Sequence, residues 1–291
     1  MSVKTFLAIV LFASLALPAF AQNRVVDSDS GGTLHLFRPN TAGEEELSTA
    51  PAAPGRNLTY HGGPTLTSAK VVTIFWGPSF ANPAGSQTPG AIAGELNAMV
   101  SQFGTTGEYN TITQYSGIQQ TNLFVDYWID PANPPHTAVT DTDIRNEVKN
   151  YINTRAGGAI NTSAVYEVFL PNGFYSSSGG STSCGGPNLQ YCAYHSHFTF
   201  NSKDVKYGSM PYPSCGGCQW TGWTTAQNFE HFVCHETREA VTDPDLNAWY
   251  DRQGNEADDK CAWSPSPFIG TGGYGYQYEW SNQNRACIKT R

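Results

Sequence analysis

The chain has few charged residues and no cluster of basic ones. Only 14% of its 291 residues are charged, and 24 acidic residues outnumber 16 lysines and arginines, which gives a formal net charge of −8. Because the basic residues are scattered, no stripe of them can neutralise successive phosphates of a nucleic acid. We therefore expect no nucleic acid among the partners of this protein.

Long hydrophobic runs are missing after the first twenty or so residues. Lys4 gives the start of the chain a positive charge, and an apolar stretch from Phe6 to Phe20 follows it. Ala19-Phe20-Ala21 then forms a small-x-small cleavage site. This order of regions predicts a signal peptide over residues 1–21. The stretch is shorter than the ~20 residues that cross a bilayer, which argues against a membrane span. We expect a secreted protein, extracellular or periplasmic.

Cysteine is absent before residue 184, and all seven cysteines follow. An oxidising compartment favours disulfides over thiolate metal sites. The spacing leaves one cysteine over, Cys234, which we expect to be a free thiol buried in a helix. The expected bonds are the two pairs that are near in sequence, Cys184 with Cys192 and Cys215 with Cys218, and the natural long pair, Cys261 with Cys287.

Apolar periodicity divides the remaining chain into a leader and one domain. Residues 22–56 are rich in Ser, Gly, Pro, Ala and Glu with little periodicity, which predicts a disordered leader or pro-segment. Strand-like runs at 71–76, 123–129 and 164–170 alternate with helical spacing at 90–104 and in a helix that Asp141 would cap. We predict a single α+β domain over 57–291, a mixed β-sheet packed with helices, loop-rich and disulfide-stapled.

The strongest helix signal opens the last quarter of the chain and contains the candidate chemistry. Thr224 and Gln227 form a capping box at its start, and Pro244 follows its end. Within it, His235 and Glu239 are four residues apart and so lie on one face, with Glu236 beside them. In HExxH zinc enzymes the first and last residues bind zinc and the intervening Glu is the general base. A carboxylate also binds zinc, so HExxE predicts a zincin-like helix.

A third zinc ligand has to come from another segment. Asp259, in an acidic loop twenty residues after Glu239, is the first choice. Zinc is the expected cofactor, and calcium in the acidic loop is the alternative, although the spacing does not match an EF-hand. Further candidate ligands or neighbours of the site are Glu256, Asp243, His231 one turn before His235, and His195 and His197, which alternate on a strand-like segment.

Several short motifs resemble the Exordium-like (phosphate-induced protein) family of secreted proteins, known chiefly from plant cell walls. They are Tyr60-His61-Gly62-Gly63-Pro64 before the 71–76 run, Cys192-Ala193-Tyr194-His195, Cys215-Gly216-Gly217-Cys218-Gln219-Trp220, His235-Glu236 leading to Thr242-Asp243-Pro244, and Asn247-Ala248-Trp249-Tyr250. The resemblance implies a secreted or wall-associated role in growth or environmental response, without an agreed catalytic activity.

Two functions of different class follow from these observations. The first is a secreted zinc peptidase that acts on a peptide or protein substrate, with Glu236 as the base. The second is a non-catalytic extracellular protein whose aromatic residues bind cell-wall glycan or protein. Zinc content separates the two.

Overall fold

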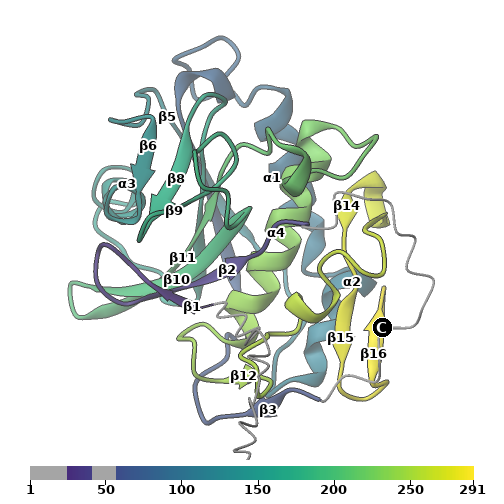
Figure 1. Cartoon of the computed structure of the whole chain (residues 1–291). Helices are drawn as coiled ribbons and strands as arrows, with labels where there is room; N and C mark the ends of the chain where they lie inside the picture. Colours follow the sequence, from purple (N-terminus) through teal and green to yellow (C-terminus); the bar gives the residue numbers. More distant parts are fainter. Residues whose placement is uncertain (1–24, 41–56) are drawn as a thin grey trace, which may run out of the picture.

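The structure is a computed structural model that describes residues 25–40 and 57–291 (Figure 1). The predicted signal peptide over residues 1–21 lies outside the described residues, as do residues 22–24 and 41–56 of the predicted leader.

A seven-stranded mixed sheet forms the centre of the protein, in the order β1-β2-β10-β11-β7-β4-β5. Strands β11, β7, β4 and β5 are parallel, whereas β1, β2 and β10 are joined by antiparallel pairing. The strands predicted at 71–76, 123–129 and 164–170 correspond to β4, β5 and β7. The strands span Val25–Asp27 (β1), Thr33–Phe37 (β2), Lys70–Trp76 (β4), Phe124–Asp130 (β5), Ala164–Phe169 (β7), Ala193–Phe200 (β10) and Lys203–Met210 (β11).

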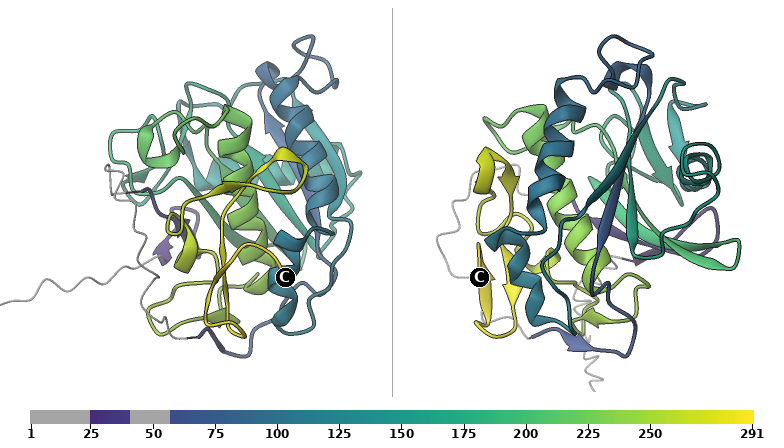
Figure 2. Two further views of the ribbon diagram at one scale, coloured as in Figure 1. Left: turned by 90° about the vertical axis from the view of Figure 1, so that its right-hand side faces the viewer. Right: turned by 180° about the vertical axis from the view of Figure 1, so that it is seen from behind.

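Helices cover both faces of this sheet (Figure 2). Helices α1 and α4 pack together on one face, and α3 lies on the other. The α3 N-cap is Thr140 and not Asp141, because the Thr140 hydroxyl accepts the Asp143 N–H while Asp141 accepts bonds from two buried tyrosines. The α-helices span Ala91–Phe103 (α1), Gly107–Asn110 (α2), Asp141–Thr154 (α3) and Thr225–Thr242 (α4).

The apolar run of β4 is buried on both faces, as expected for a strand inside a parallel sheet. Val71 and Phe75 pack in the core beneath α1 and α4, whereas Val72, Ile74 and Trp76 pack in the core beneath α3. The sheet therefore separates two hydrophobic layers, and the α+β class predicted from the sequence is confirmed.

Smaller elements complete the fold. β3 pairs with β12, β13 with β14 and β15 with β16, and β6, β8 and β9 form a small sheet of their own. The short strands are Thr59–Tyr60 (β3), Ala138–Thr140 (β6), Tyr175–Ser178 (β8), Ser181–Thr182 (β9), Trp249–Tyr250 (β12), Phe268–Ile269 (β13), Gly275–Tyr276 (β14), Glu279–Ser281 (β15) and Ala286–Ile288 (β16). The 3-10 helices are Pro78–Phe80 (η1), Thr111–Gln114 (η2), Gly216–Cys218 (η3), Asp259–Cys261 (η4) and Thr271–Gly273 (η5).

The prediction of a disordered leader is wrong for residues 25–40. This segment forms β1 and β2, and β2 pairs antiparallel with β10 inside the central sheet. Leu34, Leu36 and Phe37 are fully buried there. Three of the larger apolar residues of the leader lie in this one strand, and their burial outweighs the polar composition of the segment around it.

Three disulfides staple the chain, but two of the predicted pairings are wrong. Cys184 bonds to Cys215 and Cys192 bonds to Cys218, because the loop before β10 lies beside the loop after β11. The Cys261–Cys287 bond is confirmed, and Cys234 is a free, buried cysteine in α4 as predicted.

No helix within the described ranges is long and apolar enough to cross a membrane.

Candidate metal centre

Helix α4 is enclosed on nearly all sides, which places its polar residues inside the protein. It begins with the predicted capping box of Thr224 and Gln227 and ends at Thr242, before Pro244. It lies between the sheet and the C-terminal strand β14, and it packs beside α1 (Figure 1). Helical spacing then aims His235, Glu236 and Glu239 toward β2 and β10, and each of the three is 0% exposed.

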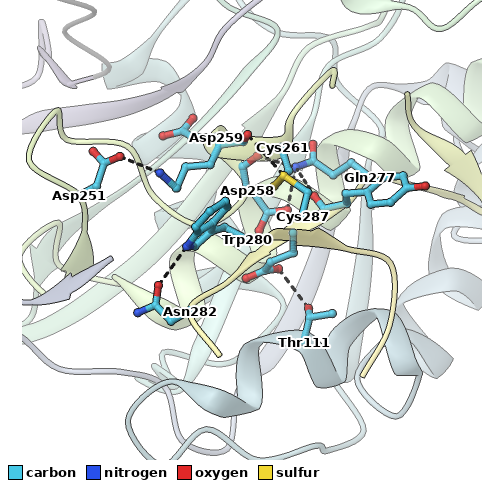
Figure 3. Close-up of a disulfide and its surroundings, with 12 residues drawn as sticks. Thr111, Asp251, Asp258, Asp259, Cys261, Gln277, Trp280, Asn282 and Cys287 are labelled. Atoms are coloured by element: carbon cyan, nitrogen blue, oxygen red, sulfur yellow. Dashed lines mark hydrogen bonds and ion pairs between the residues drawn. A yellow bond between two sulfur atoms is a disulfide. The ribbon is translucent and has the colours of Figure 1, made fainter. Parts of the chain in front are cut away.

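The structure brings the three predicted zinc ligands together. His235 Nε2 is 3.1 Å from Glu239 Oε2 and 3.8 Å from Asp259 Oδ1. The Asp259 N–H donates to Glu239 Oε1 at 2.9 Å, which turns Oε2 toward His235. Asp259 opens η4, whose last residue Cys261 is held by the disulfide to Cys287 (Figure 3).

Gln277 fixes the orientation of His235 from the side opposite Glu239. Its Nε2 donates to the Asp258 carbonyl and carboxylate at 2.8 and 2.9 Å (Figure 3). Its Oε1 is therefore the acceptor that faces the histidines. His235 Nδ1 lies 3.1 Å from this oxygen and His231 Nε2 lies 2.8 Å from it. His235 therefore carries its proton on Nδ1, and the Nε2 lone pair faces Glu239 and Asp259.

His35, in β2, enters the same cluster although it was assigned to a disordered leader. Its Nε2 is 2.8 Å from Asp259 Oδ2 and its Nδ1 is 3.0 Å from Glu256 Oε1. Phe37, two residues later on β2, stacks on the His235 ring with centroids 4.0 Å apart. Strand β2 thus supplies both a polar group and a packing surface to the site.

His195, in β10, completes the cluster beside the predicted general base. Its Nδ1 lies 3.0 Å from Glu236 Oε2 and 3.9 Å from Glu239 Oε2. Its Nε2 lies 3.7 Å from Glu256 Oε1. The cluster therefore consists of three imidazoles and four carboxylates, which we call the Glu239 cluster: His35, His195, His235, Glu236, Glu239, Glu256 and Asp259.

Burial dominates the electrostatics of the cluster. Desolvation, followed by repulsion from Glu239, raises the pKa of Glu236 well above its usual value. Desolvation and then the acid Asp259 raise the pKa of Glu239, and desolvation and then Asp243 raise that of Glu256. Desolvation lowers the pKa of His195 well below 6.5, so this imidazole is neutral.

Several polar atoms inside the cluster have no hydrogen-bond partner among the described residues. They are His195 Nε2, Glu236 Oε1, Glu239 Oε2 and Glu256 Oε2. Buried polar atoms without partners are costly, so such a concentration is typical of a site that receives a ligand. Imidazole nitrogens and carboxylate oxygens together suit zinc and other first-row divalent metals.

A second buried ionic network borders the cluster. The Arg238 guanidinium pairs with the Asp258 carboxylate, and its Nε is 2.8 Å from Glu279 Oε2. Thr111, in η2, donates to the same Glu279 oxygen (Figure 3). Arg238 is thus matched by two carboxylates of its own and holds the segment before Asp259 against α4.

Three of the other candidate residues have different roles. Asp243 accepts the backbone N–H groups of Asn247 and Ala248 and so closes the turn after α4. His231 contacts Gln277 and does not reach the carboxylates by any contact that the structure records. His197 points to a separate half-buried group, with Nδ1 2.8 Å from Asp204 Oδ1 and 4.0 Å from Asp245 Oδ1.

Sequence reasoning missed His35 and Gln277. His35 sits in Thr33-Leu34-His35-Leu36-Phe37, the one apolar run of the leader, and this run was the available signal for a strand. No local pattern marks Gln277, because its contacts with His235 and Asp258 arise only when β14 packs beside α4 and β15 packs beside η4.

Comparisons with family models, with curated proteins and with solved structures find no match to this chain. Its function has to be inferred from the geometry of the Glu239 cluster.

Proposed function

We propose that this protein is a secreted, metal-dependent hydrolase, and more specifically a zinc peptidase. The observation that carries the proposal is the convergence of His235 Nε2, Glu239 Oε2 and Asp259 Oδ1 on one point, with Glu236 beside them. These three side chains offer ligand atoms that all lie within 4.8 Å of one another. The three disulfides are in keeping with an oxidising compartment.

Zinc held by His235, Glu239 and Asp259 would supply a Lewis acid that polarises the scissile carbonyl and lowers the pKa of water. Glu236 is the group placed to accept the proton of that water. A carboxylate in this position can accept the proton of the water and return it to the leaving amine. His195 Nδ1 lies within hydrogen-bonding distance of Glu236 Oε2, at 3.0 Å, and keeps this carboxylate in position.

Glu236→Gln tests the proposed base. The amide is nearly isosteric with the carboxylate but cannot accept the proton, so we expect zinc to stay bound and hydrolysis to fall by a factor of ~10² to 10⁴. Zinc is measured by mass spectrometry of the purified protein and turnover with a mixture of internally quenched peptides. Glu95→Gln, at an exposed position of α1, is the matched control. Unchanged turnover in Glu236→Gln rejects Glu236 as the base.

The burial of the cluster favours a second candidate, a structural metal centre in a non-catalytic extracellular binding protein. All seven side chains are at most 5% exposed. Structural zinc sites are closed, whereas catalytic sites keep a coordination position open to substrate. Cobalt-substituted protein separates the two: a change in its visible spectrum on adding acetohydroxamate supports the hydrolase, and an unchanged spectrum supports the structural centre.

A further inference from the structure

Glu239 lies at the point where the three imidazoles of the cluster meet. Its Oε2 is 3.1 Å from His235 Nε2, 3.8 Å from His35 Nε2 and 3.9 Å from His195 Nδ1. Three different groups of potential ligands share it, namely His235 with Asp259, His35 with Glu256, and His195 with Glu236, and within each group the ligand atoms lie within 4.8 Å of one another. One carboxylate therefore belongs to three adjacent groups, and one of them contains Glu236, the proposed base, which leaves two as ligand sets.

Asp259 divides its two oxygens between the same two histidines. Its Oδ1 faces His235 Nε2 at 3.8 Å, and its Oδ2 faces His35 Nε2 at 2.8 Å. The two histidines come from different elements, α4 and β2. A carboxylate that presents one oxygen to each of two ligand sets has the geometry of a bridge between two cations.

The charge of the cluster also favours two cations over one. Its four carboxylates are buried with three imidazoles, and the basic side chains nearby in sequence are engaged elsewhere. Arg238 pairs with Asp258 and Glu279, and Lys260 pairs with Asp251 at 3.0 Å. Metal binding requires deprotonated ligands, and with all four carboxylates ionised one divalent cation would leave two negative charges in a desolvated site, whereas two divalent cations match all four.

Unpartnered atoms mark the second position as well as the first. Glu256 is 1% exposed, its Oε1 contacts His35, and its Oε2 has no hydrogen-bond partner among residues 25–40 and 57–291. His195 Nε2, 0% exposed, is also unpartnered in the described part of the chain, but His195 Nδ1 faces Glu236 Oε2 at 3.0 Å, so this residue belongs with Glu236 and not to the second position.

We propose that the Glu239 cluster binds two divalent cations, the first held by His235 and the second by His35 and Glu256, with Glu239 and Asp259 shared between them. This inference rests on the metal site of the proposed function and adds a second ion to it. Glu236 and His195 stay outside the two ligand sets as the proton-accepting pair. Two-metal sites of this kind place their ions ~3.5–4 Å apart and clamp the attacking and leaving groups of a hydrolysis.

The test is the number of cations bound by the full-length, metal-free protein. We expect a titration with Zn²⁺ to reach two equivalents at the cluster, and Mn²⁺-loaded protein to give the electron paramagnetic resonance spectrum of an exchange-coupled pair. One equivalent, or the six-line spectrum of isolated Mn²⁺, overturns the two-ion inference and leaves the proposed hydrolase standing. No bound cation overturns both.

Variants of the second ligand set locate the second ion. We expect His35→Ala and the conservative Glu256→Gln each to lose one of two equivalents and the coupled spectrum, while the ion at His235 remains. His197→Gln is the control, because His197, Asp204 and Asp245 are a rival place for a cation elsewhere in the fold. The inference is overturned if His197→Gln loses one equivalent of bound cation while Glu256→Gln keeps two.

Discussion

Gln277→Leu is the most informative single change, because Gln277 contacts the metal centre only through another residue. Its Oε1 accepts from His235 Nδ1 at 3.1 Å and from His231 Nε2 at 2.8 Å, while its Nε2 donates to Asp258. Leucine has a similar size but can neither accept nor donate a hydrogen bond. The substitution therefore leaves the His235 ring in place and removes the group that fixes its tautomer.

The expected loss follows from these contacts. Removal of the hydrogen-bond partner of a metal-binding histidine lowers metal affinity ~10- to 100-fold, equivalent to ~1.4–2.8 kcal/mol. Two buried imidazoles also lose an acceptor, at ~1–3 kcal/mol each, so the free energy of unfolding falls as well. Metal affinity and the free energy of unfolding should both fall. The lower metal affinity should also be measurable at temperatures at which the variant is fully folded.

The assay is competition for Zn²⁺ with a chromophoric chelator, alongside thermal unfolding of the metal-free protein. Gln87→Leu is the matched control, because Gln87 is exposed and its side-chain amide bonds to the backbone of Ile129, far from α4 in the sequence. An unchanged zinc dissociation constant in well-folded Gln277→Leu would refute the idea that Gln277 orients a metal ligand.

Three further predictions concern the fold. Burial, and then repulsion from the neighbouring Asp130, raises the pKa of Glu147 from 4.5 to about 8. The contribution of this group to stability is therefore fully present below pH 4.5 and is lost as the pH rises through 8. Glu147→Gln should become more stable than wild type over this window, by at most ~5 kcal/mol, and a thermal-shift series from pH 4 to 9 measures it; parallel curves would disprove the assignment. Arg238→Met leaves two buried carboxylates uncompensated and should cost ~3–5 kcal/mol in denaturant unfolding, so a loss below ~1 kcal/mol contradicts the network. Alkylation of the unfolded, unreduced chain should modify one cysteine, Cys234, by intact mass; more than one modified cysteine means that a disulfide is missing.

Local signals explain why α4 and its motif could be predicted from the sequence. The capping box at Thr224 and Gln227, the apolar spacing and Pro244 all act within a few residues of one another. The same locality places His235 and Glu239 on one face, whatever the rest of the chain does. The acidic loop that contains Asp259 suggested this residue as the third ligand, and the structure places it beside His235 and Glu239.

Tertiary pairing explains what could not be predicted. His35 reaches the cluster because β2 adds to the edge of β10, a contact between residues about 160 positions apart. The disulfides Cys184–Cys215 and Cys192–Cys218 likewise depend on two loops meeting at one end of β10 and β11. Nearness in sequence gave the wrong partners there, because a disulfide requires nearness of Cβ atoms in space.

The central claim is that the residues around Glu239 form a metal centre, and anomalous X-ray scattering at the zinc edge tests it most directly. In crystals of the full chain grown with zinc, we expect an anomalous peak within ~2.0–2.2 Å of His235 Nε2 and of a Glu239 oxygen. The absence of a peak there, with the carboxylates and imidazoles of the cluster bonded only to one another, would contradict the account.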